Sequence, residues 1–131
     1  MERRVVNPWT WQDQYAFVQA NEIRNPAAML ICSGQTATDE SGSPMFRGDM
    51  RAQIERALDN LETVLSAAGY SLADVVRLNY FTTDVDGFLE VIDALTTRLS
   101  AAGCQATSTM LGVERLASPD YLVEFEAVAI R

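Results

Sequence analysis

The side chains of this chain that could do chemistry are carboxylates, hydroxyls and guanidinium groups, because the sequence contains no histidine. Histidine is the usual general base near neutral pH and the commonest metal ligand. The two cysteines, Cys32 and Cys104, lie far apart and form no CxxC pair, so neither a metal site nor a disulfide framework is predicted. Cys32 lies in the apolar run 29–32, which predicts a buried and inert thiol. Metal-dependent chemistry is therefore not expected.

The elements that position these side chains fit within one domain, 1–131, of globular composition with 48% hydrophobic residues. The net charge of -8 disfavours nucleic acid and anionic membranes as partners, since both attract basic surfaces. The N-terminus does not resemble a signal peptide, and no apolar run approaches membrane-spanning length. A cytoplasmic protein is expected.

Hydrophobic periodicity predicts strands and two helices. The expected strands span 15–23, 27–33, 71–84, 105–113 and 121–130, and a short extended piece at 45–46 is left open. The turn 24–26 should join the first two strands as a hairpin. Helices are expected at 48–69, with Asp49 near its start and Gly69 at its end, and at 86–102.

This order predicts an α+β fold with a mixed sheet and two helices on one face. The apolar face of the second helix is expected to include Phe88, Leu89, Leu95 and Leu99. The other face of the sheet must be hidden by something, and oligomerisation would hide it. Apolar residues on both sides of the strands favour that solution.

Four stretches, taken in order, resemble the Rid/YjgF family of reactive-intermediate deaminases, which also includes endoribonuclease L-PSP-like proteins. They are Cys32-Ser33-Gly34-Gln35 after an apolar strand, the helix 53–61 continuing to Ala67-Ala68-Gly69, the segment 74–77 into Thr83-Asp84, and the closing 123–129. The resemblance implies a chorismate-mutase-like fold with a ferredoxin-like β-α-β arrangement. It also implies a homotrimer whose sheets form a central barrel, with small-molecule clefts at the three interfaces.

The activity that the resemblance implies is hydrolysis of enamines and imines, such as 2-aminoacrylate, to a keto acid and ammonia, without metal or cofactor. Glu124 matches the family's water-handling acid, although an exposed carboxylate on a strand remains the alternative. Glu126, on the same face, is interpreted as structural. Tyr15, Ser33 and Gly34 match pocket positions, against the alternatives of ordinary packing and a strand that ends before a loop.

The segment 106–109 departs from the family pattern. Deaminases of the family carry arginine where this chain has Thr107, and often cysteine where it has Thr109. Threonine offers a hydrogen bond but no charge, and loss of a charge-assisted bond weakens carboxylate binding by about 1.5–3 kcal/mol. No Lys or Arg occurs between Arg98 and Arg115, so shifting the alignment does not restore the arginine. The segment 107–109 is expected to line a cleft that suits a neutral polar ligand better than an acid.

The sequence leaves undecided whether another arginine reaches the pocket and which of several functions the chain has. Arg24 could reach a pocket from another direction, whereas Arg115 matches a non-catalytic position of the family. The chain is expected to be either a deaminase with a non-standard substrate or a non-catalytic trimer that binds or senses a small molecule. Ribonuclease activity, attributed to some family members, is disfavoured by the acidic composition and the absence of histidine.

Overall fold

A computed structural model describes all residues, 1–131. The elements in chain order are β1 (Glu2–Val6), the 3-10 helix η1 (Trp11–Tyr15), β2 (Ala20–Arg24), β3 (Met29–Ile31), α1 (Met50–Ala67), the 3-10 helix η2 (Leu72–Asp74), β4 (Val75–Thr82), α2 (Val85–Glu90), α3 (Asp93–Ala101), β5 (Thr107–Gly112) and β6 (Val123–Ile130). The piece left open at 45–46 forms no strand, and the neighbouring Pro44 makes a single bridge with Thr38.

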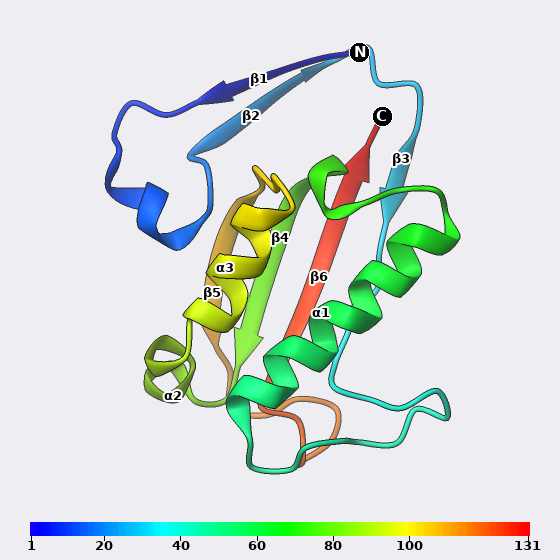
Figure 1. Ribbon diagram of the computed structural model, residues 1–131, viewed down its shortest axis with the longest axis vertical. Helices are drawn as coiled ribbons and strands as arrows, with labels where there is room; N and C mark the ends of the chain where they lie inside the picture. Colours follow the sequence, from blue (N-terminus) through cyan, green and yellow to red (C-terminus); the bar gives the residue numbers. More distant parts are fainter.

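The main sheet has four strands in the order β3-β6-β4-β5. Strands β4 and β5 are parallel, and the other two pairs are antiparallel. Helices α1 and α3 lie side by side on one face of this sheet (Figure 1). The predicted α+β fold with a mixed sheet and helices on one face is therefore confirmed.

Helix α1 forms as its sequence predicts. Its buried residues recur every three or four positions, so they fall on one face. The Asp49 carboxylate accepts a hydrogen bond from the backbone N–H of Ala52 and caps the first turn. Gly69, with φ of 79°, follows the last turn in the left-handed conformation that glycine adopts most easily. No helix in the chain is both long enough and apolar enough to cross a membrane.

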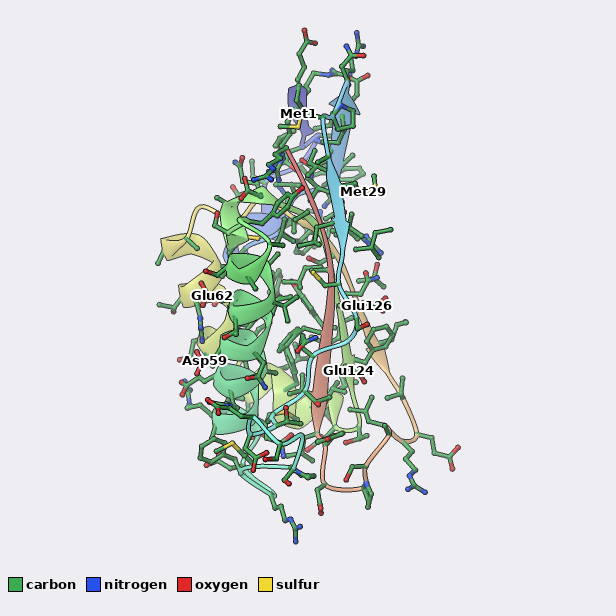
Figure 2. All side chains as sticks on the ribbon, turned by 90° about the vertical axis from the view of Figure 1, so that its right-hand side faces the viewer. Met1, Met29, Asp59, Glu62, Glu124 and Glu126 are labelled. Carbon is green, nitrogen blue, oxygen red and sulfur yellow. The ribbon has the colours of Figure 1, made fainter.

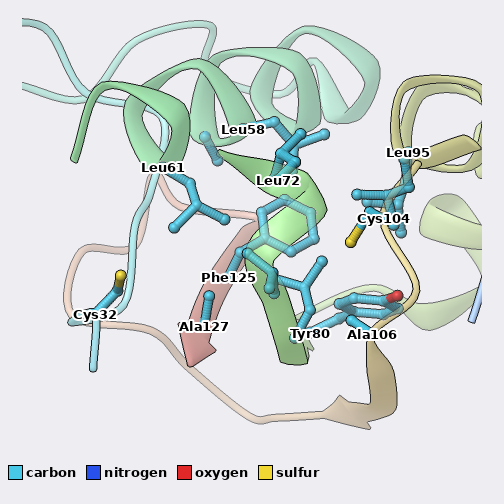
Figure 3. Close-up of a cluster of buried hydrophobic side chains, with 14 of the residues drawn as sticks. Cys32, Leu58, Leu61, Leu72, Tyr80, Leu95, Cys104, Ala106, Phe125 and Ala127 are labelled. Carbon is cyan, nitrogen blue, oxygen red and sulfur yellow. The ribbon is translucent and has the colours of Figure 1, made fainter. Parts of the chain in front are cut away.

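The core lies between the helices and the sheet, and aromatic side chains fill its centre (Figure 3). Phe125 of β6 packs edge-on against Tyr80 of β4, with ring centroids 5.6 Å apart, and both rings contact Phe88 of α2. The Tyr80 hydroxyl donates to Ser108 Oγ, and burial raises the pKa of this phenol to about 12. Both cysteines are buried and free, and burial raises the pKa of each thiol, as the inert role of Cys32 predicts.

The predicted hairpin between residues 15–23 and 27–33 is wrong. Strand β2 pairs with β1 in a separate two-stranded sheet, whereas β3 pairs with β6. The β1–β2 ribbon projects beyond one end of the main sheet (Figure 1). Arg3 and Asn21 attach it there, because both side chains donate to the backbone carbonyl of Gln105. These contacts join residues far apart in the sequence, so the local pattern did not reveal them.

The single helix predicted at 86–102 is two helices, α2 and α3. Asp84 caps α2 by accepting from the backbone N–H of Gly87 at 3.0 Å, and α2 ends at Glu90. The chain turns at 91–92 before α3 begins. The break changes which residues face the core: Phe88 is fully buried, but Leu89, expected on the apolar face, is 45% exposed.

The second face of the main sheet carries no helix. Figure 2 shows the sheet from its edge, with Glu124 and Glu126 on the side away from α1. Apolar side chains also lie uncovered on this face, which we call the open face: Ile31 is 74% exposed and Met29 is 59% exposed. Large apolar side chains exposed together on one sheet face are typical of a surface that another protein covers.

Candidate functional site

Gly34 and Glu124 lie against each other at the start of β6. The backbones of Gln35 and Phe125 exchange two hydrogen bonds, of 2.7 and 3.0 Å, in an antiparallel bridge, and the Glu124 side chain lies diagonally across this bridge against Gly34. A Cβ atom added at Gly34 would overlap Glu124 Oε1 and lie 2.6 Å from Glu124 Cδ. The glycine is needed here for space, so that the backbone can approach the carboxylate.

The environment of Glu124 favours its protonated form. Glu124 is half-buried on the open face. Burial raises the pKa of its carboxyl group, and the nearby charge of Glu126 raises it further. The Glu124 carboxylate forms no hydrogen bond or ion pair with another side chain. When it is ionised, a carboxylate with a raised pKa is a stronger base, so it can orient a water molecule and accept its proton.

Helix α1 holds the chain on both sides of this pair, through residues that the sequence did not single out. Gln53 is fully buried, and its amide donates to the carbonyl of Asp120 and accepts from the backbone N–H of Leu122, just before β6. Asn60 donates to the carbonyls of Thr36 and Thr38, just after Gly34. The only signal for Gln53 in the sequence is that it is a polar residue on the face of the helix that is otherwise apolar.

Thr107 and Thr109 lie on β5, an edge strand of the sheet. Thr107 Oγ1 donates to the carbonyl of Val76 at 3.0 Å, so its hydroxyl hydrogen is already engaged. Thr109 is exposed, and its hydroxyl accepts from Arg77. In the predicted cleft lining, the Thr107 hydroxyl hydrogen is already used in a hydrogen bond within the chain, whereas the Thr109 hydroxyl hydrogen is free to be donated.

Tyr15 lies at the end of the 3-10 helix η1 and not in a strand, which corrects the predicted span 15–23. Its side chain is 37% exposed. The same connection between β1 and β2 is bonded to the residue just before β5, since the backbone N–H of Val18 donates to the carbonyl of Ala106. This bond joins a residue three positions after Tyr15 to the neighbour of Thr107.

Five of the six predicted site residues fall into two groups within one chain. Ser33, which is exposed, and Gly34 lie with Glu124, whereas Thr107 and Thr109 lie on β5. Tyr15 lies apart from both groups in sequence, in η1. Thr107 is opposite Arg77 and Glu124 is opposite Phe81, four residues further along β4. At about 3.3 Å per residue the groups are about 13 Å apart along the strands, and they lie on different strands. One chain alone does not bring the two groups together.

The remaining predicted arginines lie elsewhere. Arg24 forms an exposed ion pair with Glu22, and this pair lies on the β1–β2 ribbon. Arg115 is exposed and lines a cavity of about 520 Å³ with Thr83 and Tyr121, in the connection between β5 and β6. None of the six predicted site residues lines this cavity.

Two polar residues of β4, Arg77 and Asn79, lie on the open face between the two groups. Arg77 Nη2 donates to Thr109 Oγ1 at 2.8 Å, and Asn79 Nδ2 donates to Glu126 Oε1 at 3.0 Å. Neither residue can be singled out from the sequence, because the register that places Arg77 opposite Thr107 is not visible there.

Comparisons with known proteins agree on one family. A family model described as endoribonuclease L-PSP matches residues 13–131. The 2-iminobutanoate/2-iminopropanoate deaminase of Escherichia coli K12 is 30% identical over 118 residues, which cover 88% of this chain and 87% of that protein. The RutC family protein YjgH of the same organism is 29% identical over 95% of this chain and 93% of its own length.

Solved structures give the same result. The Rid family protein YyfB from Yersinia pestis is 34% identical, with a TM-score of 0.89 and full coverage of both chains. Escherichia coli TdcF, solved with bound serine, is 25% identical with a TM-score of 0.71, over 82% of this chain and 84% of its own. Because the family model matches nearly the whole chain and these relatives share its fold, the chain belongs to the Rid/YjgF family, described by its model as endoribonuclease L-PSP.

Proposed function

We propose that this chain is an enamine/imine deaminase that works as a homotrimer, with Glu124 as the residue that orients and deprotonates the attacking water. The observation that carries the proposal is the close approach of Gly34 to Glu124 on the open face. A glycine at this point leaves the carboxylate unobstructed, and burial holds the pKa of Glu124 above its ordinary value. Both features suit a general base in a small pocket.

A neighbouring chain is the natural source of the second half of the site. The open face exposes Ile31 and Met29, and a trimer would cover this apolar surface. The group that contains Glu124 and the group that contains Thr107 are too far apart to bind one small molecule within a single chain. Pairing the β5 edge of one chain with the Glu124 group of the next would bring them together.

The reaction requires little beyond positioning. Water adds to the carbon of the C=N bond and gives a carbinolamine, with one water proton passing to the Glu124 carboxylate. The Glu124 carboxyl group then gives that proton to the nitrogen. As the C–N bond breaks, the carboxylate passes the hydroxyl proton of the carbinolamine to the nitrogen as well, so that ammonia leaves and a carbonyl group remains. Holding the water and the electrophilic carbon in contact supplies much of the rate enhancement in such a step.

The substrate class is a small imine or enamine. One relative is a deaminase of 2-iminobutanoate and 2-iminopropanoate, and TdcF was solved with bound serine, which is also small and polar. Thr107 stands at the position where the family resemblance implies a carboxylate-clamping arginine. We therefore propose a substrate that differs from 2-aminoacrylate in how it is anchored.

The direct test is turnover on a panel of imines that an amino-acid oxidase generates in the assay. The full chain should accelerate ammonia release from at least one of them above the uncatalysed rate, and Glu124→Gln should remove the acceleration. Exposed Glu40→Gln is the matched control, since it makes the same chemical change in a loop. Uncatalysed rates across a broad panel would contradict the proposal.

The alternative is a trimer that binds a small molecule without converting it. It is favoured by the engaged hydroxyl of Thr107, which donates to the carbonyl of Val76 and supplies neither charge nor a free donor. A compound that raises the melting temperature and is recovered unchanged would support this alternative. Ribonuclease activity is tested by incubating RNA with a preparation free of other nucleases, and we expect no cleavage.

A further inference from the structure

Arg77 lies on the open face directly beside Thr107, the position where the family resemblance implies an arginine. It is the Cα partner of Thr107 across the parallel β4–β5 pair and of Val128 across the β4–β6 pair. Side chains opposite one another on neighbouring strands project to the same face. A guanidinium is therefore present on this face one strand away, a displacement of about 4.8 Å.

The Arg77 guanidinium has donors that the chain does not use. It donates to Thr109 Oγ1 at 2.8 Å, and it forms no ion pair with any carboxylate of the chain. A guanidinium has five N–H donors, so most of them remain free. The Thr109 hydroxyl accepts from Arg77 and keeps its own O–H to donate. A half-buried guanidinium with no counter-ion is suited to bind a carboxylate.

A cavity of about 130 Å³ lies beside this side chain, lined by Arg77, Asn79 and Glu126 together with apolar residues that include Ile31 and Val128. At about 30 Å³ for each water molecule, the space holds roughly four waters or one small organic molecule. Its walls carry both a donor group and acceptors. Glu126 is a carboxylate, and Asn79 Oδ1 is a buried oxygen that accepts no hydrogen bond.

We infer that Arg77, with Thr109, binds the carboxylate of a 2-amino or 2-imino acid, and that Asn79 and Glu126 accept hydrogen bonds from its nitrogen. A buried acceptor without a partner is costly, and an N–H group of the ligand would satisfy Asn79 Oδ1. The cation and the carboxylate together match a ligand that carries both signs of charge. This reverses the expectation, based on Thr107 alone, that the cleft suits a neutral ligand. The inference deepens the proposed function and rests on it for the reaction, although the binding can be measured without turnover.

The experiment compares 2-aminobutanoate with 2-aminobutanamide, which has the same carbon skeleton but no carboxylate charge. Binding of each to the full chain is measured by calorimetry. Arg77→Gln should weaken 2-aminobutanoate binding by about tenfold to 100-fold and leave binding of the amide unchanged. Arg115→Gln is the matched control, since it removes an exposed arginine without an ion-pair partner, and it should change neither affinity.

Two further variants keep the test decisive if Arg77→Gln disturbs folding. Arg77→Lys keeps the charge but loses the two-pronged geometry, so it should give intermediate affinity. Thr107→Arg combined with Arg77→Gln returns a guanidinium to the neighbouring strand and should recover most of the lost affinity. The inference is overturned if the wild-type chain does not bind 2-aminobutanoate, if it binds the amide equally well, or if Arg77→Gln matches Arg115→Gln.

The outcomes separate this inference from the proposed reaction. If 2-aminobutanoate binding depends on Arg77 and no imine is hydrolysed, the deaminase proposal fails and the carboxylate site stands. If imines are hydrolysed and Arg77→Gln has no effect on binding or on KM, the carboxylate site fails and the deaminase proposal stands.

Discussion

Gly34 and Glu124 are in such close contact that the glycine has no room for a methyl group: a Cβ atom there would overlap Glu124 Oε1. The φ angle of Gly34 is not positive, so any residue type could adopt its backbone conformation. The constraint is therefore on space beside the carboxylate. The contact therefore explains why residue 34 is a glycine beside Glu124, the residue proposed to orient the attacking water.

Gly34→Ala should reduce activity more than stability. The atom that must move is the end of a flexible Glu124 side chain, so the free energy of unfolding should change by less than about 1 kcal/mol. A displacement of the carboxylate by about 1 Å should lower kcat/KM by roughly 100-fold. Turnover of the best imine substrate and chemical denaturation check the two parts.

A double variant shows whether this loss acts through Glu124. Gly34→Ala combined with Glu124→Gln should be no slower than Glu124→Gln alone, because both changes remove the same function. Multiplied losses in the double variant would mean that Gly34 acts by another route.

The pH dependence of activity should report the raised pKa of Glu124. The carboxylate must be ionised to accept a proton from water, so kcat/KM should fall as the pH falls through this pKa. Burial, with the charge of Glu126, places the midpoint above the ordinary pKa of glutamate. Glu126→Gln removes the like charge and should move the midpoint to lower pH, whereas Glu40→Gln should not. If the midpoint of kcat/KM is the same in Glu126→Gln as in the wild type, this assignment to Glu124 is contradicted.

Gln53→Leu should destabilise the fold although it adds an apolar side chain to a helix. Gln53 is fully buried, and the change leaves the carbonyl of Asp120 and the N–H of Leu122 without their partner. We expect a loss of about 2–4 kcal/mol in the free energy of unfolding, measured by urea denaturation at a fixed chain concentration. The exposed Gln14→Leu is the control and should cost less than about 0.5 kcal/mol. Equal effects of the two changes would rule out a special role for Gln53.

The parts of the fold that follow from local patterns could be predicted from the sequence. Helix α1, with its cap at Asp49 and its end at Gly69, follows from apolar spacing and from residue types that favour helix ends. The mixed sheet with helices on one face follows from the order of the elements. Strand β1 could not be predicted, because the contacts of Arg3 that hold it lie at residues 73–75 and 105.

The site could be predicted only in part. The contact between Gly34 and Glu124 joins two residues that the family resemblance assigns to one pocket, and their roles there stay a prediction. The position of Tyr15 in a 3-10 helix and the two-residue break at 91–92 depend on tertiary packing, which a periodicity cannot show. Arg77 was overlooked because its relation to Thr107 arises from the register between two strands separated by α2 and α3.

Ile31→Glu should weaken assembly. Ile31 is 74% exposed on the open face, and the proposed trimer would bury it. A buried carboxylate without a partner is costly, so the variant should dissociate at concentrations where the wild-type chain remains assembled. Leu89→Glu is the control, because Leu89 is exposed on α2, in the helical layer. If both variants have the mass of the wild type, the open face is not the interface.

The central claim is that neighbouring chains cover the open face and complete each site. Sedimentation equilibrium of the wild-type chain measures this directly. The account predicts a species of three times 14.5 kDa, the mass of one chain, across micromolar concentrations. A folded species of 14.5 kDa that persists well above micromolar concentration would contradict it, since Glu124 and Thr107 would then have no common ligand.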